Sequence, residues 1–235
     1  QKIRTEAHYF VLGKHSLFQS VYHNDRDTFS RVCNTCIVEQ SVDRGHDVFK
    51  VGDRGAAMYV VNHGKLAYAL GMDDLFDPTD SQEWLNLKEN NLASIISSGT
   101  VVSEVAVWLD WVHRGRLYGE AVLTDLLCVD TDLFQEVMRK SVLLKDIRLY
   151  ARLFALRAIR IGHQGYLDDL WYEEETIREI SFLALQGGLE ATVSSLAGGR
   201  ITTASVFKAW KAHTKGNFLK KPRTRLCAWL RFFVR

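Results

Sequence analysis

Glycines divide residues 45–70 into short segments, and this punctuation limits the fold more than any other feature of the chain. In "GHDVFKVGDRGAAMYVVNHGKLAYAL" the β-forming residues fall into three short runs, at 48–51, 58–61 and 65–70. The glycines between them stand where turns must come, because glycine reaches positive φ without steric cost. Short strands at this close spacing favour an antiparallel sandwich or barrel over a parallel sheet.

Helical periodicity flanks this stretch on both sides. Before it, "DRDTFSRVCNTCIVEQ" places apolar residues three and four apart, and Asp25 or Asp27 is suited to cap the start of a helix. After it, strands are expected in "TVVSEVAVW" and "RLYGEAVLTDLLCVD". The stretch "DTDLFQEVMRKSVLLKDIRLYARLFALRAIRI" then predicts a long helix with one apolar stripe. Further helices are expected at 166–186 and 203–213, and a polar connection at 71–100.

Composition and charge narrow the class of protein. The chain has 235 residues, 47% hydrophobic and 25% charged, which is ordinary for a globular protein. It contains neither a run of about eighteen apolar residues nor a signal peptide, so we expect the fragment itself to be soluble. It begins at Gln1 rather than Met, so we expect it to belong to a longer protein.

Positive charge is concentrated at the C-terminal end. Residues 191–235 contain ten Lys and Arg and no Asp or Glu. Subtracting these ten from the 30 basic residues leaves 20 against 28 acidic residues in 1–190, a net charge of −8. A basic tail interleaved with aromatic residues suits an anionic membrane surface, calmodulin or an acidic patch of the same protein. A solvated end is the alternative, and nucleic acid is not expected as a partner.

No enzyme signature is present. The chain lacks a nucleophile elbow, a P-loop, a kinase motif set and a zinc signature, so we assign no catalytic residue and no metal ligand. Cys33 and Cys36 form a CxxC, but there is no second pair of ligands at a suitable spacing. We therefore interpret these cysteines as free thiols.

The glycine-rich stretch resembles the first half of a cyclic-nucleotide-binding domain. That family's pattern is a glycine, an apolar pair, Gly-Asp, then Met/Leu-Tyr and two apolar residues, and a final glycine. The matching residues here are Gly45, Val48-Phe49, Gly52-Asp53, Met58-Tyr59-Val60-Val61 and Gly64. The resemblance extends over about residues 15–160, because "LLCVDTDLFQEVM" is similar to the family's closing strand and the start of its C helix.

The same resemblance places a phosphate-binding cassette in "SEVAVWLDWVHRGRL", residues 103–117. It implies that Glu104 accepts a hydrogen bond from the ribose 2′-OH and that Arg114 binds the cyclic phosphate. It also implies that Val105 and Ala106 offer backbone N–H groups, with Gly115 beside the arginine completing the site. The implied ligand is cAMP or cGMP, and no resident cofactor is expected.

The cassette departs from the family pattern. Ser103 replaces the glycine before the glutamate, and Gly115-Arg116 replaces Thr-Ala after the arginine, which removes a hydroxyl group. Trp108 and Trp111 are large for a small pocket, and either could fill it. His113 is interpreted as a turn residue, and Arg116 is expected to face away from the site on a strand. These departures leave two functions open, a nucleotide sensor and a degenerate domain that binds no nucleotide.

The predicted fold is α+β. An antiparallel, jelly-roll-like β-roll of about eight strands is flanked by N-terminal helices and a long C helix, with additional C-terminal helices. The expected divisions are a linker-like helical segment at 1–40, the β-roll with its C helix at 41–160, a helical extension at 161–213 and the basic tail at 214–235.

The resemblance also implies a biological context. The segment "KIRTEAHYFVLGKHSLF" is similar to the end of the linker that joins channel pores to this domain. The parent would be a cyclic-nucleotide-gated or HCN-like cation channel of the voltage-gated type, such as a potassium channel, in a divergent protist-like version. It implies an upstream transmembrane domain, a homotetramer and a place on the cytoplasmic side of a membrane. The domain would couple cAMP or cGMP binding to gating, or serve as a gating and interaction scaffold without nucleotide.

Overall fold

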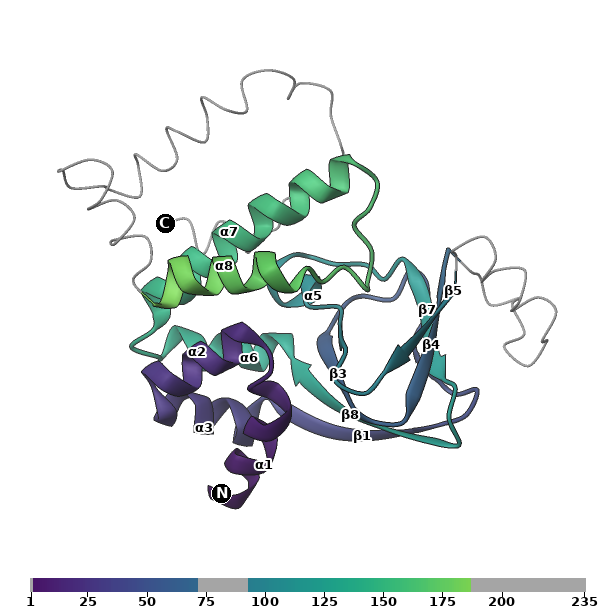
Figure 1. The fold of residues 1–235 in the computed structure, drawn as a ribbon, viewed down its shortest axis with the longest axis horizontal. Coiled ribbons are helices and arrows are strands. Elements are labelled where there is room, and N and C mark those ends of the chain that lie inside the picture. The colour runs from purple at the N-terminus through teal and green to yellow at the C-terminus, as the bar shows by residue number, and fades with distance from the viewer. Residues whose placement is uncertain (1, 72–92, 187–235) are drawn as a thin grey trace.

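The computed structural model describes residues 2–71 and 93–186. Figure 1 shows a β-roll on one side of the molecule and most of the helices gathered on the other. The predictions for most of the polar connection, for the helix at 203–213 and for the basic tail concern residues outside these ranges. No helix in the described ranges is long and apolar enough to cross a membrane.

The roll consists of two four-stranded antiparallel sheets, ordered β1-β8-β3-β6 and β2-β7-β4-β5. The strands are β1 (Ile37–Asp43), β2 (Asp47–Phe49), β3 (Ala57–His63), β4 (Lys65–Leu70), β5 (Ala93–Ser97), β6 (Val101–Val102), β7 (Gly115–Gly119) and β8 (Leu123–Asp130). The predicted α+β fold with an antiparallel roll of about eight strands is confirmed within the described residues. β5 is a strand where the sequence predicted the end of a polar connection.

The interior of the roll is filled from both sheets. Tyr59 and Val61 of β3 pack in one apolar cluster with Leu66 and Tyr68 of β4 and Leu117 of β7. The turns between the short strands depend on glycine, as the sequence predicted. The turn before β4 has Gly64 at φ +87°, a conformation that other residues rarely adopt.

Three short helices precede the roll: α1 (Lys2–Leu12), α2 (Ser16–Asn24) and α3 (Arg26–Thr35). Asp25 caps α3, because its carboxylate accepts hydrogen bonds from the backbone N–H groups of Asp27 and Thr28. The helix ends at Thr35, and the chain continues directly into β1 from Ile37. Cys33 and Cys36 are both free and buried at this junction.

The long helix predicted after the roll is divided into α6 (Thr131–Arg139) and α7 (Leu144–His163). Ser141 lies at the break, where its hydroxyl accepts hydrogen bonds from the backbone N–H of Leu143 and from the hydroxyl of Thr28 in α3. A serine side chain that bonds the local backbone competes with helical hydrogen bonding, which accounts for the break. The last helix in the described ranges, α8 (Glu174–Leu185), starts later than predicted, because residues 166–173 do not form a regular helix.

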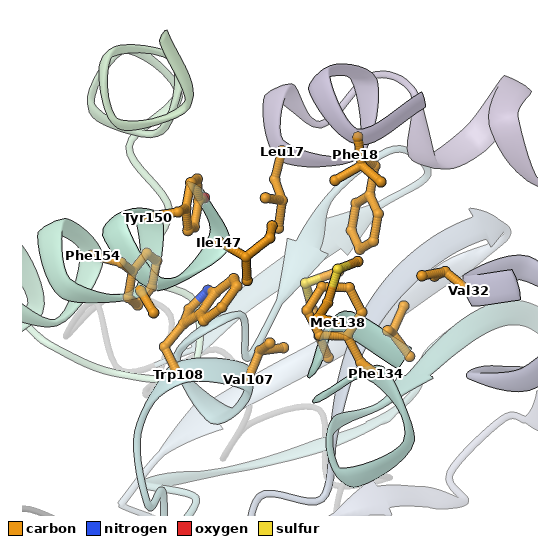
Figure 2. Packing of buried hydrophobic residues seen from close by; sticks show 14 of the residues in the cluster. Leu17, Phe18, Val32, Val107, Trp108, Phe134, Met138, Ile147, Tyr150 and Phe154 are labelled. Carbon is orange, nitrogen blue, oxygen red and sulfur yellow. The ribbon is translucent and has the colours of Figure 1, made fainter. Parts of the chain in front are cut away.

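A second apolar core joins the helices to the roll. Its centre is the single-turn helix α5 (Val105–Trp108), whose four residues are all buried. Figure 2 shows Trp108 and Val107 among side chains of the N-terminal and C-terminal helices. The ring centroid of Trp108 lies 5.0 Å from that of Tyr150 in α7 and 5.9 Å from that of Phe134 in α6. A shift of α5 would therefore change its packing against both the N-terminal helices and the C-terminal helices.

We predict that Gly64→Ala destabilises the protein more than Gly45→Ala does. Both glycines have positive φ, so each substitution costs about 1–2 kcal/mol in backbone conformation. A Cβ on Gly64 would also lie 2.6 Å from the carbonyl oxygen of Leu123, whereas one on Gly45 would meet no atom within 4 Å. Urea unfolding of the two variants should differ by at least ~1 kcal/mol. Equal losses would mean that the steric contact at Gly64 is relieved without cost.

Candidate functional site

The side chain of Asp169 occupies the centre of the cassette region. It comes from the loop between α7 and α8, and its carboxylate is fully buried. Six hydrogen-bond donors surround its two oxygens. Oδ1 accepts from Trp111 Nε1 at 2.6 Å, His113 Nδ1 at 2.7 Å and Ser103 Oγ at 3.4 Å. Oδ2 accepts from the Tyr68 hydroxyl at 2.8 Å and from the backbone N–H groups of Arg114 at 2.8 Å and Gly115 at 3.0 Å.

Most of these donors lie on one short segment, residues 111–115, which β-roll turns hold in place. The backbone N–H of Gly55 donates to the carbonyl of Trp111, and that of Gly52 donates to the carbonyl of His113. The ring of His113 is stacked on that of Phe49, with centroids 3.6 Å apart and planes 4° from parallel. The Gly-Asp turn predicted from sequence thus helps to fix the donors. His113 was predicted to be a turn residue, and its ring is part of this site.

The surroundings of Asp169 favour its ionised form. Burial acts to raise the pKa of this carboxyl, but hydrogen bonds from His113, Trp111 and Tyr68 outweigh it, so the pKa lies below the ordinary value of 3.8. The pKa of Tyr68 is raised, first by burial and then by the negative charge of Asp169. Tyr68 therefore stays protonated and serves as a donor. The neighbouring carboxyl of Asp168 has a raised pKa, chiefly through burial.

Ser103 shows how the backbone is bent to meet Asp169. It has φ +59°, so it adopts the left-handed conformation that the glycine of the family pattern would adopt more easily. Its backbone N–H donates to the Asp169 carbonyl at 2.7 Å. Loop 164–173 and the start of the cassette are thereby joined through both main chain and side chain.

Glu104 faces the opposite direction. Its carboxylate accepts hydrogen bonds from His15 in α2 at 3.0 Å, from Trp108 at 3.3 Å and from Tyr150 in α7 at 2.8 Å. The residue is only 2% exposed. In this conformation it does not face the donors around Asp169. Its predicted contact with a ribose stays a prediction, and that contact would require these three hydrogen bonds to be exchanged.

Arg114 and Gly115, whose contact with a nucleotide stays a prediction, donate their backbone N–H groups to the Asp169 carboxylate. We call the place that this carboxylate takes among its donors the anion position. The Arg114 guanidinium lies elsewhere: Nη1 donates to the Leu167 carbonyl at 2.9 Å, and the group lies 5.3 Å from the Trp111 ring centre. This side chain holds the Asp169 loop down instead of meeting the carboxylate. Arg116 forms a two-pronged ion pair with Asp47, at 2.6 and 3.2 Å.

The other predicted residues lie in the helical core. Val105 and Ala106 are buried in α5, and the backbone N–H of Ala106 donates to the Ser103 carbonyl. Trp108 packs against α6 and α7, away from Asp169, whereas Trp111 donates to it. Of the two tryptophans expected to be able to fill the pocket, Trp111 thus contacts the Asp169 carboxylate and Trp108 does not.

Asp169 itself was not predicted from the sequence. It lies in "LDDL", residues 167–170, inside a stretch that was expected to be helical. The available signal was a pair of carboxylates in a segment that also contains Leu167 and Leu170. Nothing local shows that one carboxylate of the pair is buried and its neighbour only partly so.

Comparisons with known proteins bear on the fold. No family model and no curated protein matches the chain. Among solved structures, it is similar to the sensor domain of the transcriptional regulator DNR from Pseudomonas aeruginosa, with 13% identity and a TM-score of 0.48. This similarity covers 72% of the present chain and 98% of the other.

Two further similarities have the same character. A cyclic nucleotide-binding-like protein from Brucella abortus is 13% identical at a TM-score of 0.41, over 55% of this chain and 95% of that one. A cAMP-bound PfPKA-R structure is 14% identical at 0.46, over 77% of this chain and 55% of that one. None of these similarities identifies a ligand for the present chain.

We predict that Asp169→Asn lowers the free energy of unfolding at pH 7 by about 3–5 kcal/mol, as expected when a buried charge is removed from its donors. The folded-state pKa of Asp169 is depressed, so its contribution is fully present above the unfolded value and is lost as the pH falls below 3.8. The difference between wild type and variant should therefore shrink in urea titrations at pH 3 compared with pH 7.

Asp168→Asn is the matched control. The carboxylate of Asp168 accepts from the backbone N–H of Leu170 in its own loop, and its pKa is raised, so loss of its charge should change stability by no more than ~1 kcal/mol. Equal effects of the two substitutions, or a difference that does not depend on pH, would contradict the assignment of Asp169 as the buried ion.

Proposed function

We propose that this chain is a regulatory domain of the cyclic-nucleotide-binding type whose anion position is occupied by its own Asp169, so that it acts as a gating and interaction scaffold. The observation that supports this function is the ring of six donors around a fully buried carboxylate. A carboxylate and a phosphate demand the same kind of donors, so the internal side chain fills the position that an external anion would take.

The alternative, a sensor of cAMP or cGMP, has one specific observation in its favour. The donors include two consecutive backbone N–H groups, those of Arg114 and Gly115, next to the position predicted to bind phosphate. The sensor function would require loop 164–173 to withdraw first. It would also require Glu104 to leave His15, Trp108 and Tyr150 before it could reach a ribose. The scaffold function needs neither change.

The wider context is also a proposal. The similarity of residues 2–18 to a channel linker supports a place in the cytoplasmic tail of a tetrameric cation channel, below a transmembrane domain. In that setting α1 to α3 would connect the roll to the pore. The basic tail at 214–235, with its seven Lys and Arg, would bind anionic lipid or calmodulin.

We predict that the wild-type chain gives no saturable heat with cAMP or cGMP at up to millimolar concentrations in isothermal titration calorimetry. Asp169→Ala should gain saturable binding of at least one of the two nucleotides, because its removal frees the donors for a cyclic phosphate. Asp168→Ala is the control and should resemble wild type, since the Asp168 carboxylate is not among the groups that meet these donors.

The sensor function predicts a different pattern. Wild type would then bind a nucleotide saturably, and Arg114→Ala would lose that affinity while circular dichroism showed an intact fold. Such a result would overturn the self-occupied scaffold.

A further inference from the structure

Two buried carboxylates lie on opposite sides of the cassette start. Asp169 is held by the roll, while Glu104 is held by helices at both ends of the described chain. They are joined through one peptide unit, because Ser103 binds Asp169 and Glu104 is the next residue. A movement at the anion position can therefore reach the helices through one peptide unit with a hydrogen bond at each end.

The helical end of this path begins at His15. Its Nδ1 accepts a hydrogen bond from the backbone N–H of Leu17 at 3.3 Å, which caps α2. Because Nδ1 is an acceptor, the ring proton is on Nε2, which donates to Glu104 at 3.0 Å. The N-terminus of α2 is thus connected to the cassette through a histidine with a defined tautomer.

The cluster is sealed from solvent. His15 and Glu104 are each 2% exposed, and Tyr150 is fully buried. A buried carboxylate that loses a donor leaves an uncompensated charge, so Glu104 cannot turn without a change in its partners. The left-handed conformation of Ser103 adds a second constraint. The chain turns at this residue, so that the contacts of Ser103 and those of Glu104 lie on opposite sides.

We propose that Glu104 is a coupling residue, which transmits the occupancy of the anion position to α2 through His15. The proposal rests on the function proposed above and specifies how the site is read. When Asp169 leaves, Ser103 loses its hydrogen bonds to it, the Ser103–Glu104 peptide reorients, and the contact with His15 weakens. The capped first turn of α2 then opens more often.

A second contact between the same regions must be separated from this one. Tyr172 lies on the same loop as Asp169, and its ring centre is 5.5 Å from that of His15. A signal could reach α2 through Tyr172 without Glu104. The two routes differ in their response to Glu104→Gln, since the amide cannot accept from both Trp108 and Tyr150 on one side and His15 on the other.

The test is native-state amide hydrogen exchange of the whole chain, followed at the backbone N–H of Leu17. Its rate, less the contribution of global unfolding measured at Val60 in β3, is divided by the value for wild type, so that the ratio reports local opening of α2. Asp169→Asn should raise this ratio about tenfold, which corresponds to the loss of about 1.4 kcal/mol, the scale of one hydrogen bond. Asp168→Asn should leave the ratio unchanged.

Two backgrounds then locate the path. In Glu104→Gln the added Asp169→Asn substitution should produce no further change in the ratio. In Tyr150→Phe, which removes only the link to α7, the tenfold response should persist. Should the response survive Glu104→Gln, the Tyr172 contact carries it and the proposal is wrong; no response to Asp169→Asn in wild type would also overturn it.

A second readout is needed where Asp169→Asn or Glu104→Gln reduces folding too far for exchange measurements. In that case the ring ¹⁵N signals of His15 give a second readout in wild type and in Tyr150→Phe. The coupling predicts an Nε2–H tautomer in both. A proton on Nδ1 instead would contradict the proposed link. The experiment contains no nucleotide, so its outcome and that of the calorimetry are decided independently.

Discussion

The burial of one negative charge, the Asp169 carboxylate, imposes the strictest condition on this structure. An ion removed from water is tolerated only when its oxygens are fully hydrogen bonded, and a carboxylate offers about four lone-pair positions. Here the donors come from β4, from Ser103 and from residues 111–115. These segments and loop 164–173 can therefore reach their observed positions only together. Ser103 contributes its hydroxyl to this set and, from a left-handed backbone conformation, donates its N–H to the main-chain carbonyl of Asp169.

The β-roll could be predicted from sequence because its information is local. A glycine such as Gly64 marks a turn whatever the rest of the chain does, and the apolar runs between glycines have the length of strands. For the site, the resemblance implied a phosphate contact by the Arg114 side chain and N–H donors from Val105 and Ala106, whereas the N–H groups that meet the Asp169 carboxylate are those of Arg114 and Gly115. The sequence pattern thus marked the segment, but not the groups in it that bind this carboxylate.

The identity of the anion could not be predicted in the same way. Asp169 meets Tyr68 across 101 positions, and Glu104 meets His15 across 89. Pairings at such separations depend on how the helices fold back over the roll, which a single sequence does not encode in any short pattern. The helix break at Ser141 has the same origin, because its hydroxyl is bonded to Thr28, 113 positions earlier. In each case a polar side chain forms a hydrogen bond with a residue far away in the sequence, and the local sequence pattern does not indicate this bond.

The internal anion, Asp169, competes with any external anion for the same donors. Asp169 is tethered, so its effective concentration at the donors does not fall when the protein is diluted. An external ligand can bind only to those molecules in which loop 164–173 has withdrawn. If about 1% of the molecules are in that state, the apparent affinity is about 100-fold weaker. A cyclic nucleotide would need ribose and base contacts to offset this factor. Glu104, the residue expected to supply the ribose contact, is committed to the helices by three donors. The hydrogen bonds that hold Glu104 in this position are also the bonds that connect the cassette to α2 and α7, so in the proposed function a ribose contact and this connection exclude each other.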